Sequence, residues 1–171
     1  MESRGTGRCG FAVERDVTVR KATMSSPELH ELSENQCWRL LGRKKVGRLA
    51  VSIENRPDIF PVNYQLDEET IVVRTGAGLK LAAATLGVGV AFEVDALDEM
   101  DHTGWSVVVH GSAEEVAGTE ELIDVDRLLI EPWSRGVKNR YLRITPSKVT
   151  GRQISSEPGK PASFPIGREL D

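Results

Sequence analysis

Polar and apolar residues alternate along most of the middle of the chain, and this two-residue period predicts strands rather than helices. In VGRLAVSI, residues 46–53, Leu49, Val51 and Ile53 fall on one side. Similar patterns predict further strands at 59–66, 70–75, 88–95 and 105–116, and a closing pair at 139–145 and 147–154. Pro61 indicates a strand edge or a bulge, and Gly111 indicates a bulge or bend.

Helical signals interrupt this strand pattern at three places. Ser33 and Gln36 form a capping box before an apolar helical face, which Gly42 ends. A short alanine-rich helix is expected after residue 76, and a helix over 119–130 begins with a capping Thr119. The acidic and polar turns between strands are short, which favours antiparallel pairing. The pattern therefore predicts a mainly β protein, a small barrel with flanking helices.

The two ends of the chain lack a sustained period. Residues 1–26 are rich in polar and glycine positions, and residues 155–171 hold three of the eight prolines. We expect a flexible N-terminal extension over 1–26, a compact domain over 27–154 and a flexible tail over 155–171.

Composition narrows the classes of function. A chain of 171 residues with 39% hydrophobic and 28% charged residues is ordinary for one globular domain. Its formal net charge of −4 argues against a general nucleic-acid binder. No apolar run approaches the roughly 18 residues of a membrane helix, and no secretion signal is visible. Cys9 and Cys37 form no metal-ligand pattern, and two reduced thiols suit a cytoplasmic protein.

The stretch VVRTGAGLKLAAATLG, residues 72–87, carries the main chemical signal. A strand ends in Arg74 and Thr75, two glycines follow, and Lys80 lies at the start of the alanine-rich helix. The spacing is not that of a Walker loop, and Leu81 stands where a dinucleotide fingerprint needs its third glycine. Cations at a helix start become favourable when an anion lies between them, so the stretch indicates a phosphate site. The alternative is that Arg74 pairs with a surface acid and Lys80 is solvated.

Several segments together resemble one known family. GRLAV, PVNY, VVRTGAGLK, VAFEVD, GWSVVVHGSAEEV and YLRITPSKVTGR follow one another over about residues 30–154. In this order they resemble the pyridoxamine 5′-phosphate oxidase-like, FMN-binding split-barrel family. The resemblance implies a six-stranded antiparallel split β-barrel that forms a homodimer, with a flavin at each end of the subunit interface.

The resemblance also implies roles for individual residues. The FMN phosphate would be held by Arg74, Thr75 and Lys80. The isoalloxazine ring would be lined by the strand that carries Pro61, Val62, Asn63 and Tyr64. Two residues of a later strand would also contribute near the flavin, Trp105 and Ser106, and the other subunit would supply Trp133 and Arg152.

Each of these residues also has a plainer interpretation. Tyr64 and Trp105 could be core or interface aromatics. Trp133 could cover the second long helix, and Arg152 could be an exposed charge on an edge strand.

The activity implied is a flavin-dependent oxidoreductase acting on a small-molecule substrate. His102 is a candidate general acid, whereas His110 is expected to face its partner strand in mid-sheet. Oxidation of pyridoxamine 5′-phosphate itself is not favoured, because the chain closes without the Arg-Leu segment of that enzyme. Alternatives on the same fold are a reductase that uses a deazaflavin, with the basic run 43–45 nearby, a flavin- or haem-binding protein without turnover, and a ligand-free dimerisation module.

Overall fold

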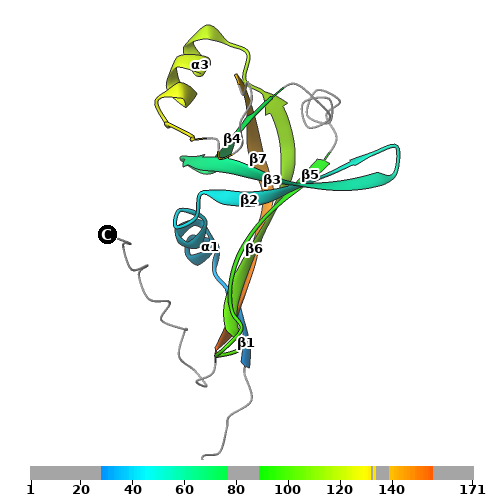
Figure 1. Ribbon diagram of the computed structural model, residues 1–171, viewed down its shortest axis with the longest axis vertical. Coiled ribbons are helices and arrows are strands. Elements are labelled where there is room, and N and C mark those ends of the chain that lie inside the picture. The colour runs from blue at the N-terminus through cyan, green and yellow to red at the C-terminus, as the bar shows by residue number, and fades with distance from the viewer. Residues whose placement is uncertain (1–27, 77–88, 132, 134–138, 156–171) are drawn as a thin grey trace, which may run out of the picture.

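The computed structural model describes residues 28–76, 89–131, 133 and 139–155 (Figure 1). The expected extension over 1–26, the expected helix after residue 76 and Lys80 lie outside the described residues, as does the expected tail beyond Ser155.

The described residues form seven strands and two helices. In chain order these are β1 (Glu28–Leu32), α1 (Glu34–Leu41), β2 (Val46–Ile53), β3 (Arg56–Asp67), β4 (Thr70–Thr75), β5 (Gly89–Asp98), β6 (Thr103–Glu115), α3 (Thr119–Asp126) and β7 (Arg140–Ser155). Every strand pairing is antiparallel.

Six of the strands form a closed ring. Following the pairings leads from β7 through β4, β3, β2, β5 and β6, and the pairing of β6 with β7 returns to the start. The expected six-stranded antiparallel barrel is therefore confirmed. The seventh strand, β1, was not expected; it pairs with residues 151–155 of β7 outside the ring. The expected closing pair of strands is instead the single strand β7, which is 16 residues long.

Strand β7 runs the length of the molecule, beside β4 near one end and beside β1 near the other (Figure 1). Its ladder with β6 shifts register between His110 and Gly111, and Ser147 is the residue left over on β7. A Cβ atom on Gly111 would lie 2.1 Å from the carbonyl oxygen of Thr145. The backbones approach too closely for any side chain, so the expected irregularity at Gly111 is confirmed.

Tight turns connect the strands where the acidic segments predicted them. Glu54 and Asn55 join β2 to β3 with φ angles of 49° and 60°, the left-handed pair that suits a two-residue hairpin turn. Glu68, at φ 52°, lies in the turn from β3 to β4.

Helix α1 begins and ends as predicted. The backbone N–H of Ser33 donates to Oε1 of Gln36 at 2.8 Å, and the Ser33 hydroxyl donates to the same oxygen at 2.9 Å. Gly42 caps the other end. The buried face, Cys37, Leu40 and Leu41, joins the barrel core.

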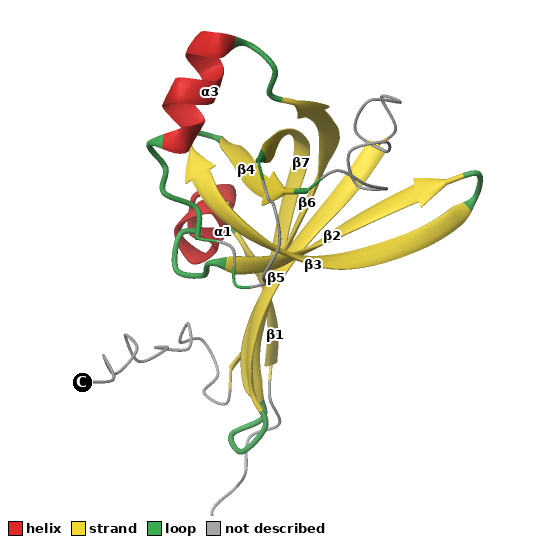
Figure 2. Ribbon diagram, turned by 45° about the horizontal axis from the view of Figure 1, so that its top comes forward, coloured by secondary structure: helices red, strands yellow, loops and turns green. Residues whose placement is uncertain are grey.

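Helix α3 covers the outer face of β4 and β7 (Figure 2). A second apolar cluster lies there and consists of Val72, Val116, Val125, Ile130 and Tyr141. The helix is shorter than the expected 119–130: Thr119 is its first residue, Gly118 is the N-cap and Arg127 the C-cap. Leu129 follows with a φ of 49°, which is incompatible with a continuing helix.

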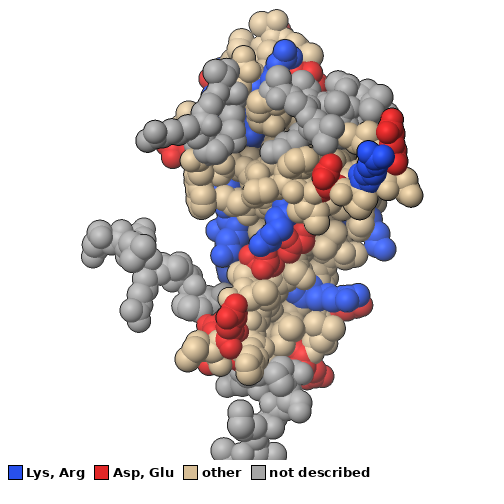
Figure 3. Space-filling model, turned by 45° about the vertical axis from the view of Figure 1, so that its right-hand side comes forward, with Lys and Arg blue, Asp and Glu red and all other residues tan. Residues whose placement is uncertain are grey.

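Charged residues of both signs are intermixed on the face shown in Figure 3. Neighbouring strands are also joined by ion pairs, namely Arg48 with Glu93 and Asp95, and Arg140 with Glu115. A further ion pair, between Arg143 on β7 and Asp67 on β3, reaches across β4. Within the described part of the chain, no helix is long and apolar enough to cross a membrane.

Candidate functional site

Strands β3 and β4 separate beside Arg74. Their ladder extends from Asp67 and Thr70 to Tyr64 and Val73 and stops there. Beyond that point β4 keeps its pairing with β7, where Arg74 lies opposite Tyr141. We call this point, with Asn63 on β3 and Arg74 on β4, the β3–β4 fork.

A pocket of about 160 Å³ lies at the fork. Its lining comes from β3, from the end of the α1–β2 connection and from the segment after α3, and consists of Lys45, Asn63, Tyr64, Gln65, Leu129, Ile130, Glu131 and Trp133. Three parts of the chain that are distant in sequence therefore meet beside Arg74.

The half-buried side chain of Arg74 has defined partners. Its Nη1 donates to the carbonyl oxygen of Ile130 at 3.1 Å. Its guanidinium carbon lies 5.6 Å from the centre of the Tyr141 ring, within the range of a cation–π contact. The Tyr141 hydroxyl in turn donates to Oδ1 of Asp126 at 2.9 Å. Burial is the main cause that raises the pKa of Tyr141, so the phenol stays a hydrogen-bond donor at neutral pH.

Asn63 fixes the other side of the fork. It is 8% exposed, and its Oδ1 accepts a hydrogen bond from the backbone N–H of Trp133 at 3.0 Å. Its Nδ2 donates to the carbonyl oxygen of Lys45 at 3.5 Å. The segment after α3 is thus attached both to Arg74 and to Asn63. The indole of Trp133 is 76% exposed beside them.

The alternation of β3 determines which backbone groups face the fork. The N–H of Tyr64 donates to the carbonyl oxygen of Lys45, on the β2 side. Neighbouring residues of a strand point to opposite edges, so the backbone groups of Asn63 and the carbonyl of Pro61 point away from β2. Pro61 pairs with Arg48 on β2, and among the described residues it has no partner on the other side. At this point β3 is therefore a local edge, one of the two positions that its lack of an N–H predicted.

Four of the sequence-predicted residues face the barrel interior. Val62, Tyr64, Thr75 and Trp105 are each at most 4% exposed. The Tyr64 hydroxyl donates to the carbonyl oxygen of Leu41 at 2.5 Å, and its ring meets Phe92 edge to face at 4.9 Å. Burial raises the pKa of Tyr64. The side chains of Tyr64 and Trp105 are therefore part of the core.

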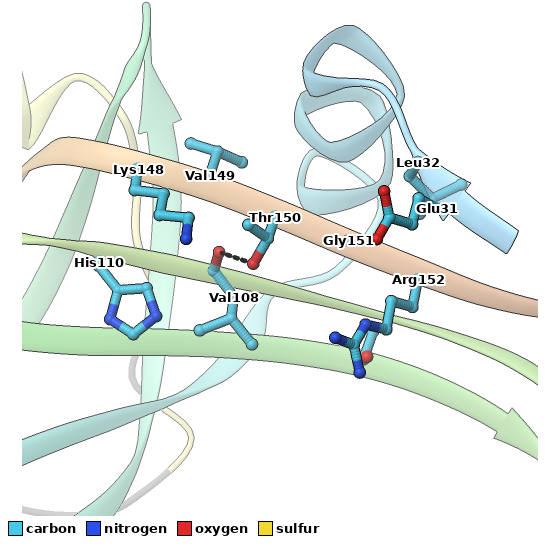
Figure 4. Close-up of a pocket in the computed structure, with 10 residues that line it drawn as sticks. Glu31, Leu32, Val108, His110, Lys148, Val149, Thr150, Gly151 and Arg152 are labelled. Carbon is cyan, nitrogen blue, oxygen red and sulfur yellow. Dashed lines mark hydrogen bonds between the residues drawn. The ribbon is translucent and has the colours of Figure 1, made fainter. Parts of the chain in front are cut away.

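The remaining candidates lie in a second hollow, which we call the β6–β7 groove (Figure 4). It has a volume of about 530 Å³ and is lined by Glu31, Leu32, Ser106, Val108, His110, Lys148, Val149, Thr150, Gly151 and Arg152. Ser106 lies opposite Arg152, and Arg152 lies opposite Glu31 on β1. Since β7 has partners on both sides here, the interpretation of Arg152 as an edge-strand charge is wrong.

The two histidines considered in the sequence analysis differ in placement. His110 lies in mid-sheet between Ala91 and Lys148, as expected, but its side chain is exposed and lines the groove. His102 is exposed in the turn before β6, with a φ of 52°. Gly104, two residues later, pairs with Ile154, so His102 is at the opposite end of β7 from the fork.

The structure does not bring the groove and the fork together within one chain. Arg74 is opposite Tyr141, and Ser106 is opposite Arg152. Tyr141 and Arg152 are 11 residues apart on β7. At about 3.3 Å per residue this is roughly 36 Å along the strand.

Comparison with known proteins assigns the family. The model of the pyridoxamine 5′-phosphate oxidase family matches residues 33–153, most of the chain. The chain belongs to this family. The resemblance inferred from the sequence is thereby confirmed. Among relatives, the uncharacterized protein Rv0080 of Mycobacterium tuberculosis is 35% identical over 147 residues, which cover 83% of this chain and 96% of Rv0080.

Solved structures of proteins more than 30% identical to this chain share the fold. The FAD-binding protein of Mycobacterium smegmatis is 33% identical with a TM-score of 0.61, over 72% of this chain and 95% of that one. The conserved protein DIP1874 of Corynebacterium diphtheriae is 37% identical with a TM-score of 0.64, over 74% and 98% of the two chains.

Sequence reasoning missed the residues that hold Arg74. Tyr141, Asp126 and Ile130 lie 52 to 67 positions away from it in sequence. The sequence shows an apolar face on the strands that become β4 and β7 and another on the helix that becomes α3, and each face must pack against something. That signal predicts packing, but it does not identify which side chain reaches the guanidinium.

Proposed function

We propose that this protein binds FMN between two copies of the chain and serves as an oxidoreductase for a small-molecule substrate. The β3–β4 fork carries the proposal, because it places an oriented arginine beside a stretch of β3 that has no partner strand on this side among the described residues. The M. smegmatis relative is described as FAD-binding, which supports a flavin as the ligand class.

Arg74 would bind the flavin phosphate. A guanidinium is planar and offers paired N–H donors that suit phosphate oxygens. Thr75 and Gly76 follow Arg74 directly in sequence. The Thr75 hydroxyl donates to the Gly76 carbonyl oxygen at 3.3 Å. Lys80 is proposed as a second cation on the basis of the sequence pattern alone.

The edge of β3 would hold the flavin ring. The imide edge of isoalloxazine alternates hydrogen-bond donors and acceptors, as does a free strand edge. The carbonyl of Pro61 and the backbone groups of Asn63 form such an edge next to Arg74. The side chains of Tyr64 and Val62 are buried in the barrel core on the opposite face of β3, so they would hold the strand in position without contacting the ring.

The partner copy would complete the site. Arg152 lies 11 positions, roughly 36 Å of strand, from the residue opposite Arg74, and Ser106 lies opposite Arg152. The linings of the two hollows share no residue, so the proposal assigns Ser106 and Arg152 to the site of the other copy. In a two-fold dimer, the groove of one copy can face the fork of the other. This arrangement would place Arg152 and Ser106 at the flavin in trans.

The flavin would supply the hydride and electron transfer when bound. The protein's own residues would bind and orient it. Arg74 and the β3 edge fix the two ends of the cofactor, and the exposed Trp133 could limit the access of water to the pocket at the fork.

A deazaflavin cofactor is the second candidate, and Lys45 favours it. Lys45 lines the pocket at the fork, where its Nζ donates to Oε1 of Gln65 at 2.9 Å. A deazaflavin with a longer anionic tail would use such an additional cation next to Arg74.

Binding of FMN to the ligand-stripped protein tests the proposal. We expect saturable quenching of flavin fluorescence that Arg74→Ala weakens strongly and Arg39→Ala leaves unchanged. Arg39 is a matched control because it is an exposed arginine on α1. Preference for a deazaflavin would support the second candidate, and absence of binding to both would refute the site. Reduction of the bound flavin by NADPH would separate an enzyme from a storage protein.

A further inference from the structure

The side chain of Arg74 is fixed by groups that a phosphate would not contact directly. The Tyr141 ring lies beside the guanidinium, at 5.6 Å from its carbon, and the Ile130 carbonyl accepts from Nη1. Asp126 accepts from the Tyr141 hydroxyl. We propose that Tyr141 and Asp126 are positioning residues that orient Arg74 for recognition of the flavin phosphate. This inference rests on the proposed function.

Tyr141 is held in place from two sides. Its ring is 5% exposed within the apolar cluster beneath α3, and its hydroxyl is anchored to a carboxylate on that helix. A ring fixed in this way offers the guanidinium one preferred orientation. An arginine loses rotational freedom when it binds an anion, and prior orientation reduces that loss.

Asp126 connects the helix to this arrangement. Asp126 is exposed at the last turn of α3, yet its carboxylate oxygen Oδ1 accepts a hydrogen bond from the Tyr141 hydroxyl at 2.9 Å. Ile130, four residues later, supplies the carbonyl that Arg74 contacts. The ring and the carbonyl that fix Arg74 are therefore both tied to α3 and the segment that follows it, and α3 acts as a support for the phosphate-binding residue.

This role has a measurable signature because it concerns the phosphate alone. Riboflavin has the same ring system as FMN but no phosphate. Without the ring, FMN binding itself must order the guanidinium, so FMN binding should weaken by about 2- to 10-fold, the cost of immobilising one long side chain. Riboflavin binding should change by less than about 2-fold, since the β3 edge is untouched.

The test compares FMN and riboflavin affinities of the full chain for the wild type and four variants. Tyr141→Leu removes the ring, and Asp126→Asn keeps the helix but weakens the anchor. Asp124→Asn is the matched control, because Asp124 lies on the same helix and bonds to Arg127 instead. Arg74→Ala reports the full contribution of the phosphate contact.

We expect the ratio of FMN to riboflavin affinity to fall in Tyr141→Leu and Asp126→Asn and to stay at the wild-type value in Asp124→Asn. If Arg74→Ala lowers the ratio but Tyr141→Leu and Asp126→Asn do not, the positioning role is wrong and the proposed flavin site stands. If the wild type binds neither flavin, or if Arg74→Ala leaves the ratio unchanged, both are overturned. Because Asp126 is exposed, Asp126→Asn keeps the test decisive even if Tyr141→Leu fails to fold.

Discussion

If Arg74 and Arg152 line the same flavin from different copies, two inactive variants should complement each other. Arg74 on β4 lies opposite Tyr141, which is 11 positions, or roughly 36 Å of strand, from Arg152 on β7. Arg74→Ala therefore damages the fork of its own chain, whereas Arg152→Ala damages the site of its partner. A mixed dimer contains one site with both defects and one site with neither.

The expected recovery follows from random pairing. Equal amounts of the two variants give half of all dimers as mixed dimers, and each has one intact site of two, so about one quarter of all sites are restored. Each variant alone should bind FMN roughly tenfold or more weakly, the effect of losing a hydrogen bond to a charged group. A titration at FMN concentrations near the wild-type dissociation constant distinguishes these cases.

Co-expression of the two variants with different affinity tags provides the mixed dimers, and flavin fluorescence measures the restored sites. Arg39→Ala paired with Arg74→Ala gives the reference signal, because Arg39 lies on α1 outside both hollows and half of all sites then stay intact whichever chain supplies Arg152. Recovery should be absent if both arginines act within one chain. Undiminished FMN binding by Arg152→Ala alone would show that Arg152 has no part in the site.

Further predictions concern the stability of the barrel. Tyr64→Phe should lower the free energy of unfolding by ~1–3 kcal/mol, because the Leu41 carbonyl loses a buried donor at 2.5 Å; an unchanged urea midpoint would contradict this. Burial raises the pKa of Tyr64 above its unfolded-state value. Above about pH 10 the unfolded chain therefore loses this proton while the folded protein keeps it, and the free energy of unfolding of the wild type should fall as the pH rises. Tyr64→Phe should reduce that alkaline slope in denaturant titrations, and an equal slope would exclude Tyr64 as its source. Gly111→Ala should destabilise by ~1–3 kcal/mol or more, because the new Cβ would lie 2.1 Å from the Thr145 carbonyl oxygen. Gly89→Ala, whose nearest contact would be at 3.9 Å, should cost less, and equal melting temperatures of the two variants would contradict the steric argument.

The strand period predicted the ring of the barrel because its strands bury one face in the core, and β4, which is buried on both faces, is a short apolar run between turns. It failed for β1, whose residue Leu29 is 59% exposed and which is defined by backbone pairing with β7. It also divided β7 at Pro146, since proline usually interrupts a ladder. In the structure Pro146 lies at the bulge opposite Gly111, where the ladder is already irregular.

The candidate site was predictable where its signal is local. Arg74, Thr75 and the glycine that follows are adjacent in sequence, so a strand ending in cations and glycines indicates a phosphate site without knowledge of the fold. The support of Arg74 by Tyr141 depends on the register of β4 with β7. Such a register is set by the closed ring as a whole and not by either strand.

Native mass spectrometry of the protein after incubation with FMN tests the central claim most directly, because it reports the number of chains and of cofactors together. We expect one species that contains two chains and two FMN molecules, and loss of both FMN molecules in Arg74→Ala without loss of the dimer. A single chain that carries FMN would contradict a site shared between two copies. A dimer that binds no flavin would contradict the proposed function.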